Sequence, residues 1–164
     1  MSRAFVNEDN AAAQADQPVE RQVSTQPNYV TPEGLAQLQA KVAELQQRHG
    51  EQSARGEQAD KQRLADLERD LRYFNQRLQS AQVVPAPSST QKVQIGSRVT
   101  FADEHDTERT VQLVGEDQAD APAGLINWGS PLGRALLGAQ LGDEVLWRRP
   151  AGDQTIEIIR IETA

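Results

Sequence analysis

The chain has 164 residues, a formal net charge of −7 at pH 7 and no cysteine. The negative charge argues against nonspecific binding to nucleic-acid phosphates, and the missing thiols exclude disulfides and thiolate metal sites. No segment reaches the roughly 20 apolar residues that a membrane span requires, and residues 1–10 lack the apolar core of a signal peptide. We therefore expect a cytoplasmic protein that binds neither membranes nor specific nucleic-acid sequences.

Residues 1–28 are rich in Ala, Gln, Asp, Asn and Pro, with few apolar side chains between them. Such a segment buries too little apolar surface to offset the entropy lost on ordering. We predict a flexible N-terminal arm over residues 1–28. The alternative is that a short motif within it, such as Ser2–Val6, docks on another surface.

Residues 29–84 have a helical pattern. Thr31 and Pro32 form a helix start signal, and apolar side chains then recur at three- and four-residue spacing in two stripes. Two narrow stripes joined by a polar segment predict an antiparallel coiled-coil hairpin, which satisfies its own seam and leaves the protein a monomer. Equal arms of about 22 residues place the turn near Gly56. The predicted seam consists of Leu35, Leu38, Val42, Leu45, Leu64, Leu67, Leu71, Phe74 and Leu78.

Prolines in residues 85–92 predict a linker that ends the second helix. Residues 93–164 then alternate apolar and polar side chains in short runs, which indicates strands, interrupted by one short helix that starts at Ser130–Pro131 and ends at Gly138. We therefore predict an α+β fold, with a hairpin followed by a sheet that carries one short helix. The predicted strands are Val93/Ile95 with 98–101, then 109–114, 125–128, 144–148 and 154–161.

The order strand, Ser-Pro turn, short helix, Gly-Asp turn and strand over residues 125–145 resembles the C-terminal domain of the GreA/GreB transcript-cleavage factors. Residues 29–38 are similar to the entry into the first helix of that family, and residues 63–73 to its second helix, closer to GreB than to GreA. The resemblance covers residues 29–164. It implies an FKBP-like C-terminal domain over residues 93–164 and a coiled coil that enters the secondary channel of RNA polymerase, which would be the partner.

The family carries an acidic tip with the pattern Gly-Asp-x-x-Glu-Asn, which helps to hold the Mg²⁺ that drives cleavage of backtracked RNA. The matching segment begins at Gly50 and has Glu51 at the first acidic position, but Ala54 at the second and Arg55 beside it. A single carboxylate next to an arginine is a poor ligand set for Mg²⁺. We therefore assign no catalytic or metal residue, with Glu51 as the one candidate, and no cofactor except the polymerase's own Mg²⁺ if cleavage is stimulated.

The tip also differs in position, because the first helix is about two heptads shorter than in the family. A turn at Gly56 puts Glu51 on a helix flank, with Glu57 and Asp60 near the turn.

These observations support three functional hypotheses. The first is a Gre-like elongation regulator that binds polymerase with weak or no cleavage stimulation, and that is not itself an enzyme. The second is an active cleavage factor that uses Glu51 with Glu57 or Asp60. The third is a peptidyl-prolyl isomerase, for which the C-terminal domain offers few aromatic side chains. The predicted docking residues are Ser130, Pro131, Leu132, Arg134, Leu136 and Leu137, of which the leucines would also fit a core under the sheet.

Overall fold

The computed structural model describes residues 19–164, so the Ser2–Val6 motif and most of the predicted arm lie outside the described residues. The chain divides into two compact units. The described part of the first comprises residues 19–24 and 38–79, and the second comprises residues 25–37 and 80–164. The domain boundaries expected from the sequence stay a prediction. No helix within residues 19–164 is long and apolar enough to cross a membrane.

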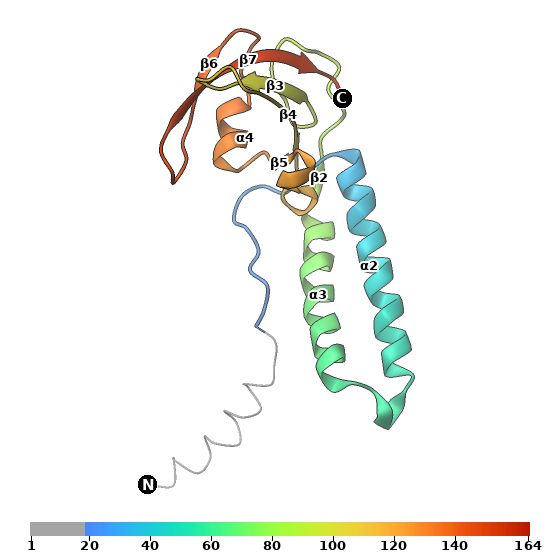
Figure 1. Cartoon of the computed structure of the whole chain (residues 1–164). Helices are drawn as coiled ribbons and strands as arrows, with labels where there is room; N and C mark the ends of the chain where they lie inside the picture. The colour runs from blue at the N-terminus through green and yellow to red at the C-terminus, as the bar shows by residue number, and fades with distance from the viewer. Residues whose placement is uncertain (1–18) are drawn as a thin grey trace. The chain divides into compact units, whose positions relative to one another are not determined.

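The hairpin is formed by α2 (Pro32–Ser53) and α3 (Lys61–Ser80), which are joined through the short 3₁₀ helix η1 (Gly56–Gln58). Thr31 caps α2 as predicted, because its Oγ1 accepts a hydrogen bond from the Gly34 amide at 3.0 Å. In Figure 1 the two helices lie side by side and run in opposite directions.

Side-chain contacts between α2 and α3 fix their register. The Lys41 ammonium lies 5.9 Å from the centre of the Phe74 ring, and His49 Nε2 lies 3.1 Å from Glu68 Oε1. Moving forward along α2 therefore means moving backward along α3. This is the antiparallel arrangement that the two stripes predicted.

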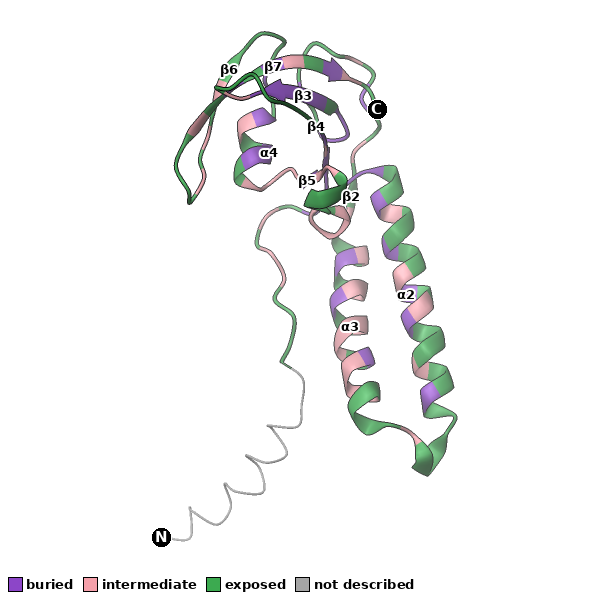
Figure 2. Ribbon diagram, in the orientation of Figure 1, coloured by how far each residue is buried: buried purple, intermediate pink, exposed green. Residues whose placement is uncertain are grey.

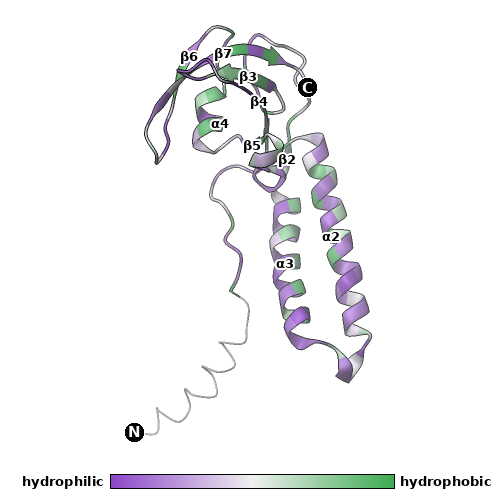
Figure 3. Cartoon of the chain, viewed as in Figure 1, coloured by the Kyte–Doolittle hydropathy of each residue, from purple (hydrophilic) through white to green (hydrophobic). Residues whose placement is uncertain are grey.

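The facing sides of the helices bury a narrow apolar stripe. Leu38, Val42, Leu45 and Leu67 are buried, and the other predicted seam residues are half-buried (Figure 2). Both helices consist mostly of hydrophilic residues along their length (Figure 3). Burial extends beyond the predicted seam to three further side chains, Gln52, Tyr73 and Arg77.

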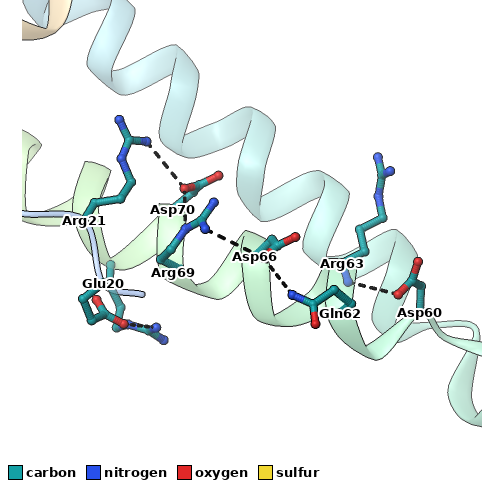
Figure 4. A network of polar contacts seen from close by, with 9 residues as sticks. Glu20, Arg21, Asp60, Gln62, Arg63, Asp66, Arg69 and Asp70 are labelled. Carbon is teal, nitrogen blue, oxygen red and sulfur yellow. Dashed lines mark hydrogen bonds and ion pairs between the residues drawn. The ribbon is translucent and has the colours of Figure 1, made fainter. Parts of the chain in front are cut away.

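Residues 20 and 21, which fall within the predicted arm, contact α3. Glu20 forms an ion pair with Arg72, and Arg21 Nη1 lies 3.5 Å from Asp70 Oδ1 (Figure 4). The Arg21 guanidinium also lies 4.0 Å from the centre of the Tyr73 ring. This cation–π contact covers a face of α3 that the heptad pattern leaves out, and it accounts for part of the burial of Tyr73.

In the second unit, five strands form one sheet in the order β5-β4-β3-β7-β6, antiparallel except for the parallel pair β4 and β5. Each corresponds to a predicted strand. The helix α4 (Pro131–Leu136) packs against the sheet at β5 and β6 (Figure 1). The strands are β3 (Arg98–Ala102), β4 (Glu108–Val114), β5 (Leu125–Asn127), β6 (Glu144–Trp147) and β7 (Gln154–Glu162), and two 3₁₀ helices, η2 (Glu116–Gln118) and η3 (Ala121–Ala123), connect β4 to β5.

The alternation of apolar and polar side chains that predicted the last strand is interrupted towards its end. The pairing of β3 with β7 shifts by one residue and skips Ile159, which makes a β-bulge. Ile156 and Ile158 point into the core before the bulge, and Ile161 does so after it. Without the bulge, Arg160 would lie on the core-facing side of the strand, and its guanidinium would be buried.

The first strand begins later than predicted, at Arg98. Val93 does not join β3, because its backbone bonds to the end of α4 instead: its amide donates to Ala139 O at 2.9 Å, and its carbonyl accepts from Gly138 N at 2.8 Å. Val93 is nevertheless part of the apolar core. That core consists of Val93, Val99, Phe101, Val111, Leu113, Ile126, Leu132, Leu136, Ala139, Ile156, Ile158 and Ile161.

A second, two-stranded sheet was not predicted. It pairs β1 (Tyr29–Val30) with β2 (Gln82–Val83) in parallel. Gly115 allows the chain at Tyr29 to come this close to β4, since a Cβ at Gly115 would lie 2.5 Å from the Tyr29 carbonyl oxygen. Strands of two residues are too short to show an alternating pattern in the sequence.

Candidate functional site

The hairpin tip is held by polar contacts between the two helix ends. Gln52 is 6% exposed, and its Oε1 accepts a hydrogen bond from the Asp60 amide at 2.9 Å. Asp60 in turn caps α3, because its Oδ1 accepts from the Arg63 amide at 3.1 Å. Gly56 has φ of +60°, a conformation that favours glycine, so the predicted turn at Gly56 is confirmed.

Two of the predicted acids line one surface depression at this tip. Glu51 lies in the last turn of α2 and is exposed, accepting a hydrogen bond from Gln47 Nε2 at 3.2 Å. Glu51 and Asp60 line the same surface depression, of about 350 Å³. Glu57 lies in η1 and is not among the residues that line the depression.

Positive charge surrounds these two carboxylates. Arg48, Arg55 and Arg63 line the same depression, and Arg48 forms an ion pair with Glu44 at 2.7 Å. Cations close to a carboxylate compete with a metal ion for its charge. Across residues 19–164, no group of three or more His, Asp or Glu side chains is arranged to hold a metal ion.

In the second unit, α4 is fixed to the sheet by its first turn. Ser130 Oγ accepts from the Gly133 amide at 3.1 Å and donates to the Asn127 carbonyl at 2.7 Å, so its hydroxyl is fully used as the predicted N-cap. A Cβ at Gly133 would lie 2.3 Å from Asn127 O, so only glycine allows α4 to pack this closely on β5.

Apart from Ser130, which is half-buried, the predicted docking residues divide into two groups. Leu132 and Leu136 are buried in the core under the sheet. Pro131, Arg134 and Leu137 are exposed, and Leu137 keeps 39% of its surface. The surface available to a partner is therefore the outer side of α4.

A groove of about 720 Å³ adjoins the start of α4, and three of the predicted docking residues, Ser130, Pro131 and Leu132, line it. Its other lining residues were not predicted. Its apolar lining includes Leu125, Pro131 and Trp147, and a second depression of about 520 Å³ shares Pro131 and Arg148 with it. The groove is assembled from separate stretches around β4, η3, β5, α4 and the β6–β7 hairpin. The only local sequence feature that pointed to the groove was the segment Trp147–Pro150, in which two arginines and a proline follow a tryptophan. A tryptophan in a strand is by default assigned to the core, so the segment did not predict a groove.

The acidic loop around His105 is an exposed turn. Asp103 Oδ1 accepts hydrogen bonds from the Thr107 amide at 3.0 Å and the His105 amide at 2.8 Å. These backbone donors hold the pKa of Asp103 below its ordinary value, with the Thr107 bond as the larger cause.

Comparison with known proteins places the chain in a family. The family model described as transcription elongation factor, GreA/GreB, C-terminal, matches residues 88–163. The chain is 32% identical to the transcription elongation factor GreB of Neisseria meningitidis serogroup B, over 82% of this chain and 93% of that protein. It is 38% identical to GreA of Sphingopyxis alaskensis, over 70% of this chain and 73% of that protein.

GreB of Pseudomonas aeruginosa is 33% identical, over 81% of this chain and 89% of that protein. The crystal structure of GreA factor homolog 1 (Gfh1) of Thermus thermophilus aligns with 84% of this chain and 99% of its own, at 20% identity and a TM-score of 0.41. The sequence relatives define a class of transcription elongation factors, and their matches span nearly the whole length of the GreB proteins. The chain belongs to the GreA/GreB family, and the broad GreB matches support the predicted closeness to GreB.

Proposed function

We propose that the chain is an elongation regulator that binds RNA polymerase at its secondary channel and stimulates transcript cleavage weakly or not at all. In this proposal the helical hairpin is a coiled coil that enters the channel, and the sheet unit is an FKBP-like domain that docks outside it. The protein acts as a monomer with no cofactor of its own. Family membership supports the polymerase as partner.

The observation that carries the proposal is the composition of the tip. Family members with the pattern Gly-Asp-x-x-Glu-Asn present two carboxylates, whereas Ala54 replaces the second acid here. Asp60 supplies another carboxylate nearby, but three arginines line the same depression. A hard divalent cation needs several oxygen ligands in direct contact, and the tip offers two acids in a depression that three arginines also line.

Docking is tested by the binding of the full chain to core RNA polymerase. We expect Leu137→Glu to weaken binding, because Leu137 is exposed on the outer side of α4. The matched control is Leu141→Glu, which makes the same change at an exposed leucine that lies beyond α4, in the turn before β6. A wild-type chain that does not bind core polymerase would contradict the proposal.

The active cleavage factor remains a second candidate because Glu51 and Asp60 line one depression. Under this alternative, Glu51→Gln and Asp60→Asn should each abolish the release of short 3′ fragments from backtracked complexes. Asparagine is as good an N-cap as aspartate, so the second change removes charge without removing the cap of α3. If the wild type releases no fragments, this candidate is excluded.

A further inference from the structure

Residues 19–24, which we call the strap, belong to the same compact unit as α3 and contact the middle of that helix. Glu20 forms an ion pair with Arg72, and Arg21 Nη1 lies 3.5 Å from Asp70 Oδ1 (Figure 4). Two neighbouring strap residues of opposite charge therefore meet two α3 residues of opposite charge. This pairing gives the strap a defined place on the helix.

Arg21 also covers an aromatic pair on α3. Its guanidinium lies 4.0 Å from the centre of the Tyr73 ring and 4.9 Å from the centre of the Phe74 ring, and the two rings meet edge to face with centres 5.0 Å apart. A guanidinium on an aromatic face is attracted by the ring and keeps water off it. Lys41 of α2 lies 5.9 Å from the centre of the Phe74 ring, so one cation stays near the pair when Arg21 leaves.

The closed strap is held weakly. The side chains of Glu20 and Arg21 remain 61% and 41% exposed, and Val19 is 87% exposed. Ion pairs as exposed as these are weak and are screened by salt, and ordering the segment costs conformational entropy. The strap can therefore leave α3 at a small cost in free energy.

The helix supplies a substitute for each charge that the strap would withdraw. Asp70 also accepts a hydrogen bond from Arg69 Nε at 3.2 Å. Glu68 lies one turn before Arg72 and attracts its positive charge. Opening the strap leaves neither Asp70 nor Arg72 without an opposite charge nearby, so the closed and the open arrangement are both electrostatically satisfied. A contact of this kind can exist in two states that a binding partner shifts.

We propose that the strap is an autoinhibitory latch: closed on α3, it keeps the hairpin out of the secondary channel of RNA polymerase, and it must release before the hairpin enters. The proposal rests on the proposed function, in which the hairpin is the part of the chain that enters the channel. A closed strap adds a third segment to a flank of the two-helix hairpin, and it occupies charged groups that a channel wall would otherwise contact. Because only the open state is competent to bind, the latch lowers the apparent affinity in proportion to the closed fraction.

Removing the charges of the strap tests the latch. Glu20→Ala with Arg21→Ala should strengthen the binding of the full chain to core RNA polymerase about threefold or more, because the open state becomes the dominant one. The control is Arg160→Ala with Glu162→Ala, which removes the same two charges from an exposed pair in β7 and should change binding less than about twofold. Unchanged or weaker binding of the strap variant would overturn the proposal.

A covalent lock tests the same claim in the opposite direction. The chain contains no cysteine, so Glu20→Cys with Arg72→Cys introduces its only two thiols. A short bismaleimide joins them with the strap closed, whereas a long polyethylene glycol bismaleimide at the same positions lets the strap leave α3. We expect the short spacer to weaken polymerase binding about tenfold or more relative to the long one. Mass spectrometry verifies each intramolecular cross-link, and circular dichroism verifies that each product is folded.

The outcomes separate the latch from the proposed function. If wild type binds polymerase and the two spacers give the same affinity, the latch is wrong and the proposed function stands. If the short spacer tightens binding, the strap enters the channel together with the hairpin, which also overturns the latch. If neither wild type nor the strap variant binds polymerase, the proposed function fails, and the latch fails with it.

Discussion

The sheet unit buries a continuous core of twelve residues, whereas the hairpin buries only four of its nine predicted seam residues and leaves the rest half-buried. The hairpin adds polar contacts: an ion pair from Glu20, a stacked Arg21 and the Gln52 bond at the tip. Exposed ion pairs contribute about 1 kcal/mol or less, while a buried leucine contributes several times that amount. The two units should therefore respond very differently to similar substitutions.

The largest expected effect is at Leu136, which is fully buried beneath the sheet. Leu136→Ala should lower the free energy of unfolding by about 2–5 kcal/mol, because it leaves a cavity in a packed core. Both tryptophans of the chain lie in the sheet unit, so their fluorescence follows its unfolding in urea. Leu137→Ala, one residue along, should cost less than about 1 kcal/mol because that side chain is partly exposed. Equal effects would contradict the placement of α4.

Replacing glycine with alanine should have opposite effects on stability in the two units. Gly133→Ala should destabilise the sheet unit by about 1–3 kcal/mol, because the new methyl group meets the Asn127 carbonyl oxygen. Gly50→Ala lies in α2 with nothing within 4 Å of the added carbon, and should stabilise the hairpin by up to about 1 kcal/mol. Tryptophan fluorescence follows the first change, and helical circular dichroism follows the second. Destabilisation by Gly50→Ala would show that α2 does not continue through Gly50.

The smallest effect concerns the ion pair of Glu20. Its hydrogen bond to Arg72 lowers the pKa of Glu20 below the ordinary value of 4.5. The pair is therefore intact at neutral pH, and it is lost as the pH falls through the lowered pKa. In Arg72→Met, a carboxyl titration followed by NMR should show the pKa of Glu20 rising toward 4.5. An unchanged pKa would mean that residues 19–24 do not lie along α3 in solution.

Elements of both units could be predicted from the sequence where the pattern that defines them lies within a few neighbouring residues. The leucine spacing indicated the two helices, and the cap at Ser130 with Gly138 located α4 to within a residue or two. The bulge at Ile159 could not be predicted, because it depends on pairing with a strand some 60 residues away. The burial of Tyr73 was not predicted, because part of its cover comes from Arg21, which lies outside the helical pattern.

The same distinction between features set by neighbouring residues and features set by distant ones applies to the candidate sites. The turn at Gly56 was predictable from the sequence, since it depends on a few adjacent residues. The groove was not, because Arg109, Leu125 and Trp147 meet only in the folded sheet.

The most direct test of the account is to restore the missing acid at the tip. Glu51 lies in the last turn of α2, and Ala54 directly follows that helix with its amide bonded to the Gly50 carbonyl at 3.0 Å, so a carboxylate at position 54 would lie near that of Glu51. With backtracked RNA polymerase complexes, we expect wild type and the Ser53→Glu control to release little or no short RNA, and Ala54→Glu with Arg55→Asn to release clearly more. A wild type that cleaves strongly, and loses this activity in Glu51→Ala, would contradict the account.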